Sequence, residues 1–127
     1  MSGLLQPYYV QSLMHKPQLY MQAYKAEEVP VGAVMVHKGR IISTGRNTTE
    51  ESGNPTLHAE MKVIQEAAKK VGRFKLPECA LYVTLEPCPM CAGAILQARV
   101  GTLVYGAKNS LLGGCLLCFA GHASSSN

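Results

Sequence analysis

Two short motifs in this chain combine metal-binding residue types with a residue type that can carry protons. The first reads His-Ala-Glu from His58 to Glu60, and the second reads Cys-Pro-Met-Cys from Cys88 to Cys91. Imidazole nitrogen and thiolate sulfur are preferred zinc ligands, and a catalytic zinc site uses three of them and keeps a fourth position open for water. His58, Cys88 and Cys91 fit that pattern, and Glu60 can reach the same site without binding the metal. A carboxylate there could take a proton from a zinc-acidified water and deliver it to a leaving group.

Both motifs fall at expected helix starts. The segment from about His58 to Val71 predicts an amphipathic helix that ends at Gly72, because its apolar residues recur at steps of three and four, at Met61, Ile64, Ala68 and Val71. A second helix is expected over 89–98. Because Cys88 and Cys91 are three residues apart at a helix N-terminus, both sulfurs can face one point, and the helix dipole favours thiolate.

The other segments predict an α/β layer structure with a mixed sheet. Apolar and β-branched runs predict four strands, over 31–36, 40–44, 79–85 and 102–105. The first two form a hairpin that turns at Gly39, residues 47–55 form a loop, and Pro17 could start a short helix that runs to Ala26. The order is helix, hairpin, helix, strand, helix, strand, which is typical of α/β folds.

Length and composition limit the classes of protein that the chain can be. Its 127 residues correspond to one domain, and 47% hydrophobic residues suit a packed core. The net charge of +4 favours anionic partners only weakly. The longest apolar run, over 111–121, is shorter than the about 20 residues of a membrane helix, and the N-terminal residues lack the pattern of a secretory signal. We therefore expect a protein without membrane spans that is intracellular or a mature organellar form.

The five cysteines indicate metal or redox chemistry more than a disulfide framework. Their number is odd, and four of them form two C-x-x-C pairs, Cys88/Cys91 and Cys115/Cys118. A second metal site at Cys115 and Cys118, with His122 nearby, stays open but lacks a fourth ligand. The alternatives are that this tail packs on the body or on a partner chain, or that it is a poorly ordered product of truncation or alternative splicing.

Each motif alone is often structural, but their combination, H-x-E…P-C-x-x-C, is the known signature of zinc-dependent nucleobase deaminases. With its flanking residues, the chain resembles the tRNA adenosine deaminases of the bacterial and plastid type, in the cytidine deaminase-like superfamily. The resemblance covers about residues 27–114 and rests on four segments, EVPVGAV at 28–34, PTLHAE at 55–60, LYVTLEPCPMCAGA at 81–94 and VYGA at 104–107.

The resemblance implies a fold, a cofactor and a reaction. The fold would be a three-layer α/β/α cytidine deaminase-like structure with a mixed sheet of roughly five strands. The cofactor would be one Zn²⁺ per chain, held by His58, Cys88 and Cys91. The reaction would be the hydrolytic deamination of adenosine to inosine at the tRNA wobble position, an RNA-editing step in which zinc-activated water attacks C6 and Glu60 shuttles protons.

The resemblance also places contacts to the flipped base. Asn47 would hydrogen-bond the base, Val29 and Leu85 would form walls of the pocket, and the backbone amides of Ala59 and Glu86 would help to position the base and the water. The structural alternatives are that Asn47 is a turn residue and that Val29 and Leu85 are ordinary core residues.

Arg46, Lys108 and Asn109 would flank the pocket and contact RNA. The alternative is that the two cations are solvated surface charges. Many bacterial members carry aspartate where this chain has Asn109, and the neutral side chain removes a charge that phosphate would repel.

The expected partners are a tRNA anticodon loop, or single-stranded nucleic acid of this kind, and a second copy of the chain. Family members form homodimers through the helices that carry the cysteines. We expect a single deaminase domain over 1–127, with its core at about 27–114 and a divergent tail at 115–127, in the cytoplasm or the plastid stroma. The chain departs from the family in a shorter first helix and in the absence of the C-terminal helical region that helps to hold the anticodon loop.

Two other functions stay open. One is a deaminase of a free base or nucleotide, such as guanine or cytosine, which would need no extended RNA surface. The other is an inactive, truncated isoform that acts by dimerisation, although such a protein would have no chemical need for Glu60.

Overall fold

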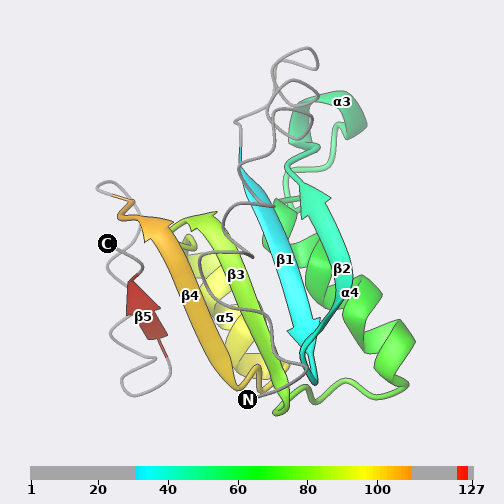
Figure 1. Cartoon of the computed structure of the whole chain (residues 1–127). Coiled ribbons are helices and arrows are strands. Elements are labelled where there is room, and N and C mark those ends of the chain that lie inside the picture. The colour runs from blue at the N-terminus through cyan, green and yellow to red at the C-terminus, as the bar shows by residue number, and fades with distance from the viewer. Residues whose placement is uncertain (1–30, 110–122, 126–127) are drawn as a thin grey trace.

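The computed structural model describes residues 31–109 and 123–125, which form a five-stranded mixed sheet with two helices behind it (Figure 1). The elements are β1 (Gly32–His37), β2 (Arg40–Arg46), α3 (Thr49–Ser52), α4 (Ala59–Val71), β3 (Cys79–Leu85), α5 (Pro89–Gln97), β4 (Thr102–Ala107) and β5 (Ala123–Ser125). The strand order is β2-β1-β3-β4-β5. Strand β1 is antiparallel to β2 and β3, whereas β4 is parallel to β3 and β5. The expected α/β fold with a mixed, roughly five-stranded sheet is confirmed.

Both faces of the sheet carry buried apolar side chains. Successive side chains of a strand point to opposite faces, so apolar residues at consecutive positions supply both faces. On β1, Ala33 and Met35 belong to the main core beneath α4 and α5, which also contains Val63, Leu81 and Ile95. The intervening residues of β1 face the other side in a second buried cluster, made of Val34, Val36, Tyr82 and Val104. A sheet that buries both faces suits a three-layer fold. The helix expected over 17–26 lies outside the described residues, so the third layer of the expected α/β/α fold stays a prediction.

Most element predictions are confirmed within a residue or two. Lys38 and Gly39 form the tight turn of the β1–β2 hairpin, with φ of 52° and 80°, as expected for a two-residue hairpin turn. The helix that begins after His58 ends at Gly72, whose φ is 84°. Two segments were predicted wrongly. The expected loop over 47–55 contains the one-turn helix α3, and the tail, where no strand was expected, contributes β5.

The topology brings several chain segments together at one end of the sheet. The parallel strands β3 and β4 end there, β2 also ends there, and the antiparallel β1 begins there (Figure 1). Carboxyl ends of parallel strands are a common place for ligand sites in α/β proteins. Gly45 near the end of β2 lets α4 approach closely, because a Cβ at this position would lie 3.1 Å from Val63 Cγ2.

Candidate active site

The two motifs meet at this end of the sheet because each lies at a helix N-terminus. His58 is the N-cap residue of α4, and Cys88 is the N-cap residue of α5, with Pro89 at the first helical position. Cys91 lies in the first turn of α5. The Nδ1 atom of His58 is 3.6 Å from Cys88 Sγ and 3.5 Å from Cys91 Sγ. The structure thus brings the three predicted ligand residues together, although the two cysteines lie 30 and 33 positions from His58 in the sequence.

The separations of these atoms fit a tetrahedral zinc ion. With Zn–S bonds of about 2.3 Å and Zn–N bonds of about 2.0–2.1 Å, ligand atoms in tetrahedral geometry lie about 3.6 Å apart. Both distances from His58 Nδ1 agree with that value. Within the described ranges, these three side chains are the one His, Cys, Asp or Glu group whose ligand atoms lie close enough to share a metal ion. The residues present therefore fit zinc with a fourth position left for water.

Glu60 lies beside these ligands and is 4% exposed. Burial raises its pKa to about 7, although hydrogen bonds from its own backbone amide and from the Cys91 side chain lower the pKa. Burial also raises the pKa of the Cys91 thiol, and the nearby Glu60 and Cys88 raise it further. A metal cation at this point would stabilise the thiolate form, because its charge is close to both sulfurs.

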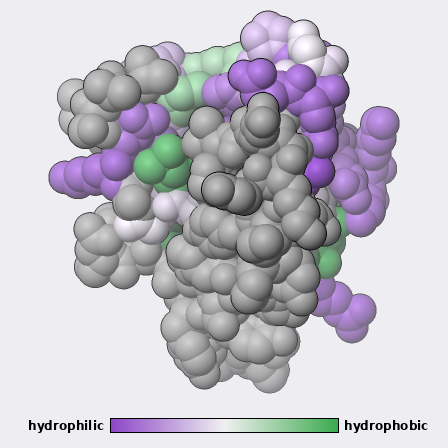
Figure 2. Space-filling model, turned by 90° about the horizontal axis from the view of Figure 1, so that it is seen from above, coloured by the Kyte–Doolittle hydropathy of each residue, from purple (hydrophilic) through white to green (hydrophobic). Residues whose placement is uncertain are grey.

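A cavity of about 180 Å³ opens next to the ligands. It is lined by Val31, Asn47, Thr49, His58, Glu60, Leu85, Cys88 and Asn109. A single water needs only about 10–15 Å³ of such space, so the cavity can accept a much larger molecule. The described surface at this end of the sheet is mainly hydrophilic (Figure 2). The arrangement combines candidate metal ligands, a buried carboxyl group and polar side chains around one space.

Asn47 is buried, and its side chain has a structural partner. Its Oδ1 atom accepts a hydrogen bond of 2.8 Å from the backbone amide of Ala59, the first residue of α4. This contact satisfies one of the free amides at the helix start, between the candidate ligand His58 and the candidate proton carrier Glu60. In this structure the Ala59 amide therefore binds Asn47, where the resemblance had implied a contact to substrate.

Leu85 and Asn109 line the cavity, and Val29 lies outside the described residues. The backbone amide of Asn109 donates a 3.0 Å hydrogen bond to Glu86 Oε1. Two further lining residues, Val31 and Thr49, were missed by the sequence analysis. Val31 falls within the segment that carries the resemblance, so its place could have been suspected, but no sequence signal pointed to Thr49.

The two cationic residues expected to flank the pocket, Arg46 and Lys108, differ in their surroundings. Arg46 Nη2 lies 3.0 Å from Glu51 Oε1, and Nη1 donates to the backbone oxygen of Asn47 at 3.2 Å. This side chain thus stabilises the loop that carries Asn47 and is not the solvated charge that was considered as the alternative. Lys108 is exposed next to Asn109. The second C-x-x-C pair, Cys115/Cys118, lies outside the described residues.

The fold and the site indicate the class of protein, the deaminases, with His58, Cys88 and Cys91 as candidate zinc ligands. Residues 9–113 match the MafB19-like deaminase family. The structure is similar to one from a study of A-to-I editing by tRNA:A34 deaminases at the wobble position of transfer RNA. The TM-score is 0.81 and the identity 36%, and the match covers 91% of both chains.

Sequence similarity to known proteins indicates which family of deaminases the chain belongs to. The chain is 48% identical over 110 residues to the tRNA-specific adenosine deaminase of Bacillus subtilis, a match that covers 80% of this chain and 68% of that protein. It is 63% identical over 86 residues to the chloroplastic tRNA(adenine(34)) deaminase of Arabidopsis thaliana. This second match covers 68% of the chain but only 7% of the much longer Arabidopsis protein. The chain belongs to the tRNA-specific adenosine deaminase family. None of the helices described within 31–109 has the length and apolar character of a membrane span.

Proposed function

We propose that this chain deaminates adenosine to inosine at the wobble position of a tRNA anticodon, an RNA-editing step of tRNA processing. The observation that carries the proposal is the meeting of His58, Cys88 and Cys91 beside the buried Glu60, at the edge of a cavity. The identity to tRNA-specific adenosine deaminases supports the choice of substrate. In this proposal His58, Cys88 and Cys91 hold one Zn²⁺, and the chain is one deaminase domain with its core at about 27–114.

The reaction joins water to C6 of the adenine ring and releases ammonia. His58, Cys88 and Cys91 would hold the zinc ion, which would supply a water acidic enough to react at neutral pH. Glu60 would accept a proton from the attacking water and pass protons to the ring nitrogen and to the departing amino group. The new bond joins oxygen to C6 and the broken bond joins C6 to nitrogen, so that the products are inosine and ammonia. The buried position of Glu60 keeps bulk water from competing for these protons.

The cavity walls supply recognition of the base. Because Asn47 Oδ1 already accepts a hydrogen bond from the Ala59 amide, we expect the two N–H donors of its amide group to be the atoms that it offers to a base. Asn47 therefore contacts a hydrogen-bond acceptor on the base, such as a purine ring nitrogen. Leu85 provides an apolar wall and Asn109 a polar edge, and the roles of Val29 and the Glu86 amide are proposed from the family resemblance.

We also propose that two chains pair through α5, in the cytoplasm or the plastid stroma. Helix α5 is mainly apolar, yet Gly93 and Leu96 on it are exposed, and the Leu96 side chain is 41% exposed. Exposed apolar helix surfaces commonly mark interfaces. Analytical ultracentrifugation of the wild type and of Leu96→Asp tests this proposal. We expect a dimer that Leu96→Asp weakens, and a monomeric wild type would contradict the pairing.

The deamination proposal is tested with purified protein of known zinc content. The substrates are an anticodon stem-loop with adenosine at position 34, the same stem-loop with its only adenosine moved into the stem, and free guanine, cytosine and adenosine. We expect inosine from the first substrate alone, and none with Glu60→Gln. Turnover of a free base without turnover of the stem-loop would replace the proposal with a free-base deaminase. Zinc binding without any turnover would point to an inactive isoform that acts by dimerisation.

A further inference from the structure

Asn109 lines the cavity although it lies two residues beyond the end of β4. The ladder of β4 with β3 ends at the Leu85–Ala107 pair, two residues before Asn109. The backbone amide of Asn109 donates to the carboxylate oxygen Oε1 of Glu86, at 3.0 Å. This hydrogen bond joins the segments that leave two neighbouring strands.

Glu86 is itself fixed in place. It lies between the cavity wall Leu85 and the N-cap residue Cys88, and it is buried, with 9% exposure. Hydrogen bonds to an ionised group are stronger than neutral ones, so this contact can help to hold the segment that carries Asn109. Glu86 is not among the residues that line the cavity, and we therefore do not expect its side chain to contact a bound base directly.

Thr84, near the end of β3, makes a similar hydrogen bond next to another lining residue of the cavity. The hydroxyl oxygen of Thr84 accepts a 3.1 Å hydrogen bond from the backbone amide of Gly32, which follows the lining residue Val31. Thr84 and Glu86 thus each bind a main-chain amide next to a lining residue. Through these two hydrogen bonds, the end of β3 fixes the segments that carry the lining residues Val31 and Asn109.

We propose that Glu86 is a positioning residue that sets the place of Asn109 at the cavity and thereby the affinity for substrate. This inference rests on the proposed function for its kinetic consequence, but the hydrogen bond itself can be tested without any reaction. Because Glu86 acts through Asn109 and not on the reacting atoms, its removal weakens substrate binding while the chemical step continues.

The kinetic test compares Glu86→Ala with Glu86→Gln on the anticodon stem-loop. Glu86→Ala removes the acceptor, and we expect KM to rise about tenfold, equivalent to ~1.4 kcal/mol, with kcat and zinc content close to wild type. Glu86→Gln retains an acceptor oxygen without the charge and should restore most of the affinity. The matched control is Glu78→Ala, an exposed carboxylate just before the start of β3, which should leave KM unchanged. An equal fall in kcat, or no change in KM, would overturn the proposal.

A double-mutant cycle with Asn109→Ala tests whether the effect runs through Asn109. If it does, Asn109→Ala adds little to KM in the Glu86→Ala background, since coupled residues are not additive. Full additivity of the two changes would contradict the inferred route.

Amide hydrogen exchange supplies a readout that needs no activity. We expect slow exchange at the Asn109 amide in the wild type, exchange about tenfold faster in Glu86→Ala, and an intermediate rate in Glu86→Gln. If Glu86→Ala does not fold, Glu86→Gln alone decides, because an unchanged exchange rate in it would contradict the charge-assisted bond. A wild type that is inactive on the stem-loop, with the expected exchange pattern, would end the proposed function but leave the positioning role standing.

Discussion

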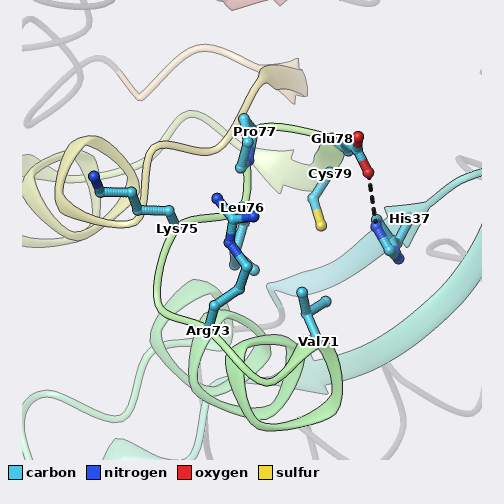
Figure 3. Close-up of a pocket in the computed structure, with 8 residues that line it drawn as sticks. All are labelled: His37, Val71, Arg73, Lys75, Leu76, Pro77, Glu78 and Cys79. Carbon is cyan, nitrogen blue, oxygen red and sulfur yellow. Dashed lines mark ion pairs between the residues drawn. The ribbon is translucent and has the colours of Figure 1, made fainter.

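The two ends of the sheet each gather a histidine, a cysteine and a carboxylate, but among the described residues only one end brings ligand atoms close enough to share a metal ion. At the far end, His37, Glu78 and Cys79 line a hollow of about 60 Å³ together with basic and apolar residues (Figure 3). At the near end, the same residue types form the site around His58. Because the residue types are the same, the two ends show how much a candidate metal site depends on geometry.

Geometry distinguishes the two ends. At the far end, His37 Nε2 lies 3.5 Å from Glu78 Oε2, which also lies 3.8 Å from Lys38 Nζ, and the Glu78 side chain is 64% exposed. Figure 3 shows this ion pair beside Cys79, but these three residues do not form a group with ligand atoms close enough to share a metal ion. Histidine and glutamate there belong to a strand end and a loop, where no helix N-terminus directs them to a common point.

The electrostatic surroundings differ as well. Glu60 is buried and its pKa is raised to about 7, whereas Glu78 is exposed to water. Burial raises the pKa of the Cys79 thiol, and the charge of Glu78 raises it further. A buried thiol next to a carboxylate remains protonated and unreactive when no metal ion is present. The same residue types thus become chemically useful only where two helix starts face a cavity.

The largest difference between the two ends is expected when one cysteine is removed from each. We expect Cys91→Ser to lose bound zinc, from about one ion per chain to almost none, and all detectable deamination, because one of three protein ligands is lost. Cys79→Ser at the far end should retain both zinc and activity. Zinc content by plasma mass spectrometry and inosine yield measure these outcomes. Equal zinc loss in both variants would contradict the difference between the ends.

The next largest difference is expected between the carboxylates at the two ends, Glu60 and Glu78. Glu60→Gln should lower deamination by about 10²–10⁴-fold, because the amide cannot carry the proton, while zinc content stays at the wild-type level. Glu78→Gln should leave the rate unchanged, since this side chain lies at the far end in water. Single-turnover rates on the anticodon stem-loop compare the two variants. A rate for Glu60→Gln near that of wild type would remove the proposed proton carrier.

Asn47 allows its structural and substrate roles to be separated. Asn47→Ala loses the hydrogen bond to the Ala59 amide and should lower the free energy of unfolding by about 1 kcal/mol, with a loss of activity. Asn47→Asp retains the oxygen acceptor at the helix start, where negative charge is favourable, but replaces the donor amide. We expect wild-type stability and reduced activity in Asn47→Asp, measured by urea unfolding and by KM. Full activity in Asn47→Asp would show that the donor group is not used.

The smallest effect is expected from the far-end ion pair. His37→Ala removes an interaction with an exposed carboxylate, and such surface pairs contribute about 0–1 kcal/mol. We expect a change in unfolding free energy within that range, no change in zinc content and no change in rate. A loss of activity in His37→Ala would mean that the far end has a functional role after all.

The parts that could be predicted from the sequence are those that depend on local patterns. The recurrence of Met61, Ile64 and Ala68 predicted α4, and the apolar run at 79–85 predicted the bounds of β3 correctly. Because His58 and Cys88 directly precede helices, their types and positions also predicted which residues meet. Local pattern and tertiary structure agree at these positions, as is usual for foldable sequences.

The parts that could not be predicted depend on contacts between distant residues. The hydrogen bonds from the Ala59 amide to Asn47 and from the Asn109 amide to Glu86 join residues 12 and 23 positions apart, and no periodicity reports them. Helix α3 was missed because its single turn lies among Asn, Thr, Ser and Gly, which are typical of loops. The β5 segment Ala123–Ser125 consists of one alanine and two serines, which have low strand propensity, and its pairing with β4 therefore depends on the available sheet edge.

The measurement that tests the central claim most directly is X-ray absorption at the zinc edge of the purified protein. With His58, Cys88 and Cys91 as ligands and one position for water, the spectrum should require two sulfur atoms at about 2.3 Å and two nitrogen or oxygen atoms at about 2.0–2.1 Å. Cys91→Ser should reduce the sulfur count or remove the zinc. A shell of three or four sulfurs would place the metal at other cysteines, and a protein that binds no zinc would contradict the account.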